Sequence, residues 1–229
     1  MIEGKTESDR RLSGAYCIRG NDLTERGELD AALSDLNESI KLNPVYACAY
    51  NNRERAYGFK RDHDRAMADY DEAIRIDPAF ALAYDNRGYV YYRKRDYAHA
   101  IEDYSMEIRI APDALAYLNR GNAYRDSEQL DRAAADYGEV IRLAPADARG
   151  WRNRGLIRLF QEKYKTGIAD YDKALQYDPE DVFSWNNRGI AKMRSGDKKS
   201  AIADLRKALE LRPGLETATA SLKKLGVRP

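Results

Sequence analysis

The segment Ala83–Tyr104, AYDNRGYVYYRKRDYAHAIEDY, recurs in altered form at two other places in the chain. Ala49–Tyr70 reads AYNNRERAYGFKRDHDRAMADY, and Ala116–Tyr137 reads AYLNRGNAYRDSEQLDRAAADY. All three copies keep an Asn-Arg pair and, sixteen residues after the Arg, an Asp, whereas neighbouring positions differ. We therefore expect the constant positions to maintain the fold and the variable ones to be candidates for function.

Proline residues extend this period over most of the chain. They are spaced by 34, 34, 33, 34 and 34 residues: Pro44, Pro78, Pro112, Pro145, Pro179 and Pro213. Counting back from each proline gives six units: residues 13–46, 47–80, 81–113, 114–147, 148–181 and 182–215. A fixed period of this length is typical of a repeat array.

Each unit places the same residue types in the same order. The fourth residue is aromatic: Tyr16, Tyr50, Tyr84, Tyr117, Trp151 and Trp185. Four residues later all units but the second, which has Glu54, carry glycine: Gly20, Gly88, Gly121, Gly155 and Gly189. A second small residue comes twelve places further on: Ala32, Ala66, Ala100, Ala133, Gly167 and Ala201. Four residues after it comes a large apolar one: Leu36, Tyr70, Tyr104, Tyr137, Tyr171 and Leu205.

Spacing within a unit predicts two helices. Apolar residues recur at intervals of three and four, which gives each helix one apolar face. Gly27 and Gly196 suit the end of a first helix, and Asp62, Asp96 and Asp197 suit the start of a second one. The proline then ends the second helix. The small residues are expected where two helices cross closely.

These aromatic, Gly, Ala, aromatic and Pro series resemble the tetratricopeptide repeat (TPR) family over residues 13–215. The resemblance implies an all-α, right-handed superhelical solenoid of six helix-turn-helix units. It also implies a concave groove, lined mainly by the first helix of each unit, that binds a peptide or a partner protein. Glu54 departs from the family pattern at the tight crossing, and Glu107 stands where alanine is usual. We expect each to be partly exposed or paired with a cation, because an unpaired buried carboxylate is costly.

The two ends of the chain lie outside the repeats. Residues 1–12 show no periodicity and are expected to be loose. Residues 216–229 are expected to form a C-terminal capping helix and tail, because an array needs a cap over the apolar face of its last hairpin.

Arginine and aspartate recur in all six units at a constant offset of sixteen residues. The arginines are Arg19, Arg53, Arg87, Arg120, Arg154 and Arg188, and the aspartates are Asp35, Asp69, Asp103, Asp136, Asp170 and Asp204. We predict an ion pair that joins the two helices of each hairpin. The alternative, a basic stripe for phosphate, is weaker because every Arg has a matching Asp.

Asparagine precedes the arginine in units two to six: Asn52, Asn86, Asn119, Asn153 and Asn187. In the TPR superhelix this position faces the groove. A similar asparagine ladder, in the glycosyltransferase that attaches N-acetylglucosamine to Ser and Thr, holds the main chain of an extended peptide. A carboxamide can pair with any peptide group, so we predict that these residues, with Asn122, contact a peptide. The alternative is that they bond neighbouring helices.

Variable positions expected in the groove turn from polar to apolar along the chain. Tyr89 belongs to the earlier units, and Leu156, Phe160 and Ile190 to the later ones. We predict an apolar anchor of the partner near these last three residues. The alternative is that some of them pack between hairpins. The carboxylate clamp of TPR co-chaperones is not predicted, because the cations that it requires are missing.

Other functional classes find little support in the sequence. His63 and His99 have no acid or nucleophile partner in a recognisable motif, and neither a cofactor nor a metal site is predicted. A net charge of +1 gives no field to attract nucleic acid, and no apolar run suggests membrane insertion. Cys17 and Cys48 occupy first helices of neighbouring units, so they are expected to lie near each other, with free thiols favoured over a disulfide.

The sequence thus predicts a protein-interaction module or scaffold that is not an enzyme and binds a peptide segment of a partner protein. A self-assembling structural scaffold, or a regulatory subunit of an enzyme complex, remains the alternative. We expect a monomer or a weak homo-oligomer, which the mass in solution at several concentrations would test. A cytoplasmic location is expected, because the first residues lack an apolar signal-peptide core, unless an export signal has been removed.

Overall fold

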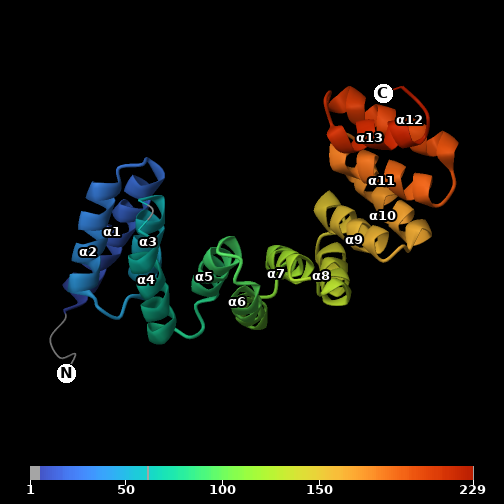
Figure 1. Ribbon diagram of the computed structural model, residues 1–229. Coiled ribbons are helices and arrows are strands. Elements are labelled where there is room, and N and C mark those ends of the chain that lie inside the picture. The colour runs from blue at the N-terminus through green and yellow to red at the C-terminus, as the bar shows by residue number, and fades with distance from the viewer. Residues whose placement is uncertain (1–5, 61, 229) are drawn as a thin grey trace. The chain divides into compact units, whose positions relative to one another are not determined.

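The computed structural model describes residues 6–60 and 62–228, with only the backbone described at residues 63 and 64. These residues form helices and no strand, which confirms the all-α prediction (Figure 1). Two compact units divide the chain, residues 1–111 and 112–229. The first contains α1 (Glu7–Glu25), α2 (Leu29–Leu42), α3 (Ala47–Phe59), α4 (His63–Ile76), α5 (Ala81–Arg93) and α6 (Tyr97–Ile110). The second contains α7 (Ala114–Asp126), α8 (Leu130–Leu143), α9 (Ala148–Phe160), α10 (Tyr164–Tyr177), α11 (Val182–Arg194), α12 (Lys198–Leu211) and α13 (Glu216–Lys224).

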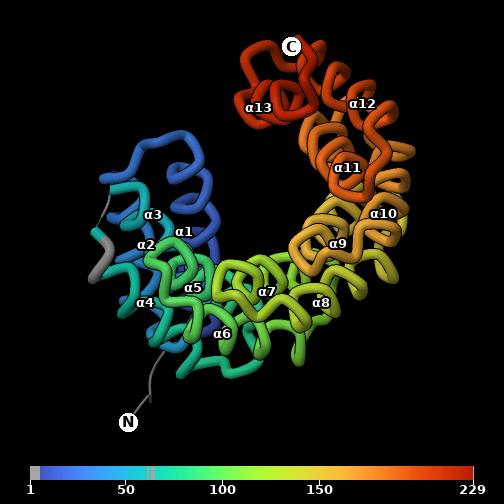
Figure 2. The backbone as a smooth tube through the Cα atoms, turned by 45° about the vertical axis from the view of Figure 1, so that its right-hand side comes forward, coloured from blue at the N-terminus to red at the C-terminus, as the bar shows by residue number. Residues whose placement is uncertain are grey.

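Each predicted repeat consists of one pair of helices that pack against each other, from α1 with α2 to α11 with α12. Within each unit consecutive hairpins lie side by side, as α2 against α3 and α10 against α11 show (Figure 2). The expected caps are present: Gly27 and Gly196 have φ of 79° and 95°, and Asp62, Asp96 and Asp197 accept hydrogen bonds from backbone N–H groups of the following helix.

The two helices of a hairpin cross where glycine faces a large side chain. A methyl group added to Gly121 would lie 2.9 Å from the ring of Tyr137, and one added to Gly155 would lie 3.0 Å from that of Tyr171. Real Cβ atoms do not approach this closely, so glycine is needed for the helices to reach their native separation. Tyr137 and Tyr171 are themselves fully buried.

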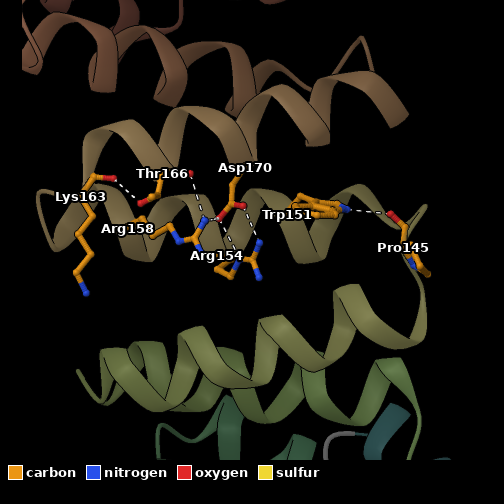
Figure 3. A network of polar contacts seen from close by, with 7 residues as sticks. All are labelled: Pro145, Trp151, Arg154, Arg158, Lys163, Thr166 and Asp170. Atoms are coloured by element: carbon orange, nitrogen blue, oxygen red, sulfur yellow. Dashed lines mark hydrogen bonds and ion pairs between the residues drawn. The ribbon is translucent and has the colours of Figure 1, made fainter.

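All six predicted Arg–Asp pairs join the two helices of their hairpins. In the fourth repeat Arg120 Nε and Nη2 each donate to one oxygen of Asp136, both at 2.8 Å. Arg154 binds Asp170 in the same forked manner, and Arg158 donates to the same carboxylate (Figure 3). The pairing prediction is therefore confirmed.

The arginine also covers the aromatic residue at the fourth position of its repeat. The Arg154 guanidinium lies 5.1 Å from the ring centre of Trp151, whose indole N–H donates to the Pro145 carbonyl at 2.9 Å (Figure 3). Trp185 and Pro179 repeat this contact. The Arg thus connects the second helix of its own hairpin to the turn that precedes the hairpin.

One prediction about the chain ends is wrong. Helix α1 begins at Glu7, where Thr6 and Asp9 form a reciprocal capping box, so residues 7–12 are helical and not loose. Residues 1–5 lie outside the described part of the chain. At the other end α13 places Ala218 and Leu222 against Leu205 and Ala208, as a cap does.

We expect Arg120→Ala to lower the free energy of unfolding by about 2–3 kcal/mol, because it leaves the buried Asp136 carboxylate without its forked partner. The matched control is Arg142→Ala, which breaks an exposed pair with Glu139 and should cost less than about 1 kcal/mol. Urea denaturation of both variants measures the difference. Equal losses would show that the conserved pair contributes no more than a surface pair.

Candidate functional site

A hollow of about 640 Å³ opens on the first unit, where α3, α4 and α5 meet. Its lining residues are Glu54, Arg55, Gly58, Phe59, Tyr70, Asn86, Tyr89, Val90, Arg93 and Lys94. The volume is within the range of small-ligand or side-chain pockets. Gly58 contributes no side chain, and this leaves the space between Glu54 and Phe59 open.

The rim of this hollow combines exposed aromatic rings with cations. Phe59 is 61% exposed and Tyr89 is 51% exposed, so both rings are accessible at the same hollow. Arg93 donates to the Tyr89 hydroxyl at 2.9 Å and lies over the Tyr89 ring, so the ring is held in place. Lys94 adds a second positive charge on the same side. The rim therefore suits an apolar group that carries a neighbouring negative charge or carbonyl.

Glu54 forms part of the wall and is buried, with 3% exposure. Its carboxyl bonds to Tyr70, while Oε2 finds no hydrogen-bond partner among the described residues. Burial raises the pKa of Glu54 from its ordinary value near 4.5 to about 7, although the bond to Tyr70 acts in the opposite direction. The prediction that Glu54 is exposed or paired with a cation is wrong, because the side chain enters the helix crossing in place of glycine. Glu107 is also buried and not partly exposed.

A second hollow of about 530 Å³ adjoins the first. It is lined by Cys17, Ile18, Asn21, Tyr46, Cys48, Asn51, Asn52, Arg55, Leu82 and Asn86. Arg55 and Asn86 line both hollows, and Arg55 is fixed by hydrogen bonds to Asn21 and Glu25 of α1. The two hollows thus form one surface across α1, α3 and α5, the first helices of three consecutive repeats.

Three of the predicted contact residues lie on this surface: Asn52, Asn86 and Tyr89. Asn52 Nδ2 donates to Cys17 Sγ at 3.3 Å, and Asn86 Nδ2 donates to Asn51 Oδ1 at 3.0 Å. Each asparagine therefore joins its own helix to the first helix of the preceding repeat. Part of each amide remains exposed at the hollows, so a bonding role and a contact role coexist.

The remaining predicted contact residues belong to the second unit. Asn153 is 8% exposed, Asn122 accepts a bond from the Tyr137 hydroxyl, Asn187 accepts one from Asn186, and Asn119 is half-buried. Of the apolar residues, Phe160 is 57% exposed at the end of α9, Leu156 is half-buried, and Ile190 packs onto the core around Leu205. For Ile190 the structure therefore favours the alternative of packing between helices.

Sequence reasoning did not find Phe59, Val90, Arg93 and Lys94 in the first hollow. Phe59 and Arg93 occupy the same position of their units as Phe160, but the residue type there changes from unit to unit, so the repeat pattern does not identify it. A signal was available at Glu54, which breaks the glycine series. A residue too large for its position implies a local change in packing.

Comparison with known proteins identifies the family. Profiles of the TPR repeat match residues 61–94, and profiles described as tetratricopeptide repeat match residues 114–147, 148–181 and 182–215. Together these segments cover more than half of the chain, and the chain belongs to the tetratricopeptide repeat family. No curated protein sequence matches it.

Solved structures show the same fold at low sequence identity. YrrB, a TPR protein, aligns with a TM-score of 0.73 and 21% identity over 82% of this chain and 97% of its own. MamA aligns with a TM-score of 0.68 and 21% identity over 78% and 94%. PilF of Pseudomonas aeruginosa aligns with a TM-score of 0.79 and 16% identity over 95% and 100%.

Two further features bear on other classes of function. His99 stacks on Tyr91 and bonds to Asp96, which together place it in a helix-capping contact at the surface. The described residues contain no cluster of three or more potential metal ligands, and none of the described helices is long and apolar enough to cross a membrane.

We expect the contribution of Glu54 to the free energy of unfolding to decrease as the pH rises from about 4.5 to 7. The folded carboxyl keeps its proton up to about pH 7, whereas the unfolded one loses it near 4.5, so raising the pH favours the unfolded chain. Glu54→Gln removes this dependence. Denaturation at pH 5 and pH 8 should therefore show Glu54→Gln gaining up to about 3 kcal/mol relative to wild type.

Glu72→Gln is the matched control for this measurement. Arg75 lowers the pKa of Glu72, so that its contribution is present above the ordinary carboxyl pKa and is lost on acidification. The control should therefore show a small change of the opposite sign. A pH-independent difference between Glu54→Gln and wild type would contradict the burial of an ionisable Glu54.

Proposed function

We propose that this protein binds a peptide segment of a partner protein on the surface formed by α1, α3 and α5. The first hollow receives an apolar side chain of the peptide between Phe59 and Tyr89. The observation that carries this proposal is the pair of exposed aromatic rings on a preformed hollow, since rigid aromatic walls gain contact area at small entropic cost.

Charge and hydrogen bonding supply the remaining specificity. Arg93 and Lys94 lie at one edge of the hollow, where they attract a carboxylate or a main-chain carbonyl of the peptide. The exposed parts of Asn52 and Asn86 are positioned for main-chain contacts along the same surface. The proposed ligand is therefore an extended segment with an apolar residue beside an acidic one.

The membership of the TPR family supports a protein-interaction role, and the structure of YrrB, similar in fold, is described as having an unusual peptide-binding site. The residues predicted in the second unit, with Phe160 as their most exposed apolar member, are a second contact region in this proposal. We propose further that the protein acts without catalysis and as a monomer or weak homo-oligomer.

The test begins with a library of random peptides displayed on phage and selected on the full chain. Synthetic peptides from the selection are then titrated by fluorescence anisotropy. We expect Phe59→Ala and Tyr89→Ala each to weaken binding by about tenfold or more, because each removes one wall of the pocket. Phe160→Ala tests the second contact region, and Tyr177→Ala, an exposed aromatic residue on α10 outside both proposed contact regions, is the control.

Circular dichroism must show unchanged helicity in all four variants. Wild-type affinity in both Phe59→Ala and Tyr89→Ala would refute the first hollow as the site. A loss confined to Phe160→Ala would move the anchor to the second unit, as the sequence alone predicts.

A further inference from the structure

Two cysteines meet in the second hollow. Cys17 lies on α1 and Cys48 on α3, in consecutive repeats, and their sulfur atoms are 3.8 Å apart. Both are free thiols. Both line the hollow, but Cys17 is 1% exposed and Cys48 is half-buried, so Cys48 is the more accessible of the two to a small solute.

The surroundings distinguish the two sulfurs. The Cys17 thiol donates to Cys48 Sγ, and the Asn52 amide donates to Cys17 Sγ at 3.3 Å and to Cys48 Sγ at 3.8 Å. The bond from Cys17 lowers the pKa of Cys48 to about 6, against the effect of burial, and Tyr46 and Asn52 lower it further. The pKa of Cys17 is raised by the same bond and by burial. Of the two sulfurs, Cys48 is therefore the one whose thiolate is favoured, and Cys17 the one that keeps its proton.

The thiolate form of Cys48 is favoured without a positively charged side chain bound to its sulfur. Tyr46, whose own pKa is raised to about 12 chiefly by burial, remains a neutral hydrogen-bond donor. Arg55 of α3 is the charged residue of the same hollow, and its guanidinium is engaged with Asn21 and Glu25. Neutral hydrogen-bond donors stabilise the thiolate: Cys17 of α1, Asn52 of α3 and Tyr46 in the turn before α3.

We propose that Cys17 and Cys48 form a peroxide-reactive dithiol site, in which Cys48 is the nucleophile and Cys17 closes a reversible disulfide between the first two repeats. The dithiol site lies in the second hollow of the surface proposed to bind a peptide, and its reaction with peroxide does not require the peptide. The two sulfur atoms are 3.8 Å apart, whereas a disulfide bond is about 2.05 Å long, so they must approach by about 1.7 Å. Rotation of the two side chains can bring them together.

The chemistry balances with hydrogen peroxide as the oxidant. The Cys48 thiolate attacks one peroxide oxygen, an S–O bond forms, the O–O bond breaks, and hydroxide leaves. The Cys17 sulfur then attacks the sulfur of the Cys48 sulfenic acid, the S–S bond forms, the S–O bond breaks, and the released hydroxide and the Cys17 proton give water. The hydroxide from the first step takes from solvent the proton that Cys48 had lost. In all, two thiols are oxidised by two electrons, and one peroxide is reduced to two waters.

A disulfide here would link α1 to α3 covalently, whereas the contacts between these helices are side-chain packing, hydrogen bonds and the Arg55–Glu25 ion pair. The link joins cysteines that are 31 positions apart in the sequence, and the closed loop restricts the unfolded chain. Oxidation should thus raise the thermal midpoint of the first unit. It should also displace the Asn52 amide, whose acceptor sulfurs enter the covalent bond.

The test treats the reduced full chain with hydrogen peroxide, traps remaining thiols with N-ethylmaleimide and measures intact mass. We expect loss of two hydrogens, no maleimide adduct, and a Cys17–Cys48 peptide on digestion, all reversed by dithiothreitol. Oxidation of wild type should be at least tenfold faster than that of glutathione under the same conditions, because the hydrogen bonds to Cys48 favour its thiolate.

Single variants assign the roles. Cys17→Ser should accumulate a sulfenic acid on Cys48 that dimedone labels, whereas Cys48→Ser should react slowly and label poorly. The thermal midpoint should respond to dithiothreitol in wild type and not in either variant. Three results would each overturn the proposal. They are oxidation no faster than that of glutathione, stronger dimedone labelling of Cys17 in Cys48→Ser than of Cys48 in Cys17→Ser, and disulfides formed only between chains.

Discussion

Each hairpin depends on the close crossing of its two helices, where glycine on the first faces a large apolar side chain on the second. The crossing leaves no space for a methyl group at Gly121 or Gly155. It also brings the Arg of the first helix within reach of the Asp on the second, so that the forked pair and the close crossing support each other. The pair alone could not set this distance, because an Arg side chain is long and flexible.

The second repeat breaks this rule and gains a surface feature. Glu54 replaces glycine, its carboxyl reaches Tyr70 inside the crossing, and a buried acid results whose pKa is about 7. Burying a carboxyl is unfavourable for the fold, yet the hollow lined by Phe59 and Tyr89 lies directly beside it. Residues that depart from a local rule at some cost are commonly found at functional sites, because selection for function can maintain them.

The fold could be predicted from the sequence because its determinants are local and repeated. Comparison of six copies of one pattern separates the constant positions from the variable ones. The constant offset of sixteen residues then locates the Arg–Asp pairs. The start of α1 was missed because periodicity was the only criterion applied, although Thr6 and Asp9 carry the capping signal. The burial of Glu54 is not predicted from the sequence. Exposure and a nearby cation are the expected ways to satisfy its carboxylate, whereas in the structure a tyrosine hydroxyl in the crossing bonds to it.

The candidate site could be predicted only in part, because it is formed by positions that do not repeat. Asn52, Asn86 and Tyr89 follow from the asparagine series and the expected groove, whereas Phe59 and Arg93 share a repeat position whose residue type changes from unit to unit. Phe59 and Arg93 line one hollow because their side chains on α3 and α5 remain exposed after the repeats pack. Packing between repeats decides which side chains these are. The hairpin interior must satisfy the crossing and the ion pair, so it varies little from repeat to repeat. The faces of α1, α3 and α5 bear no such constraint, and the two hollows and the thiol pair are all found on them.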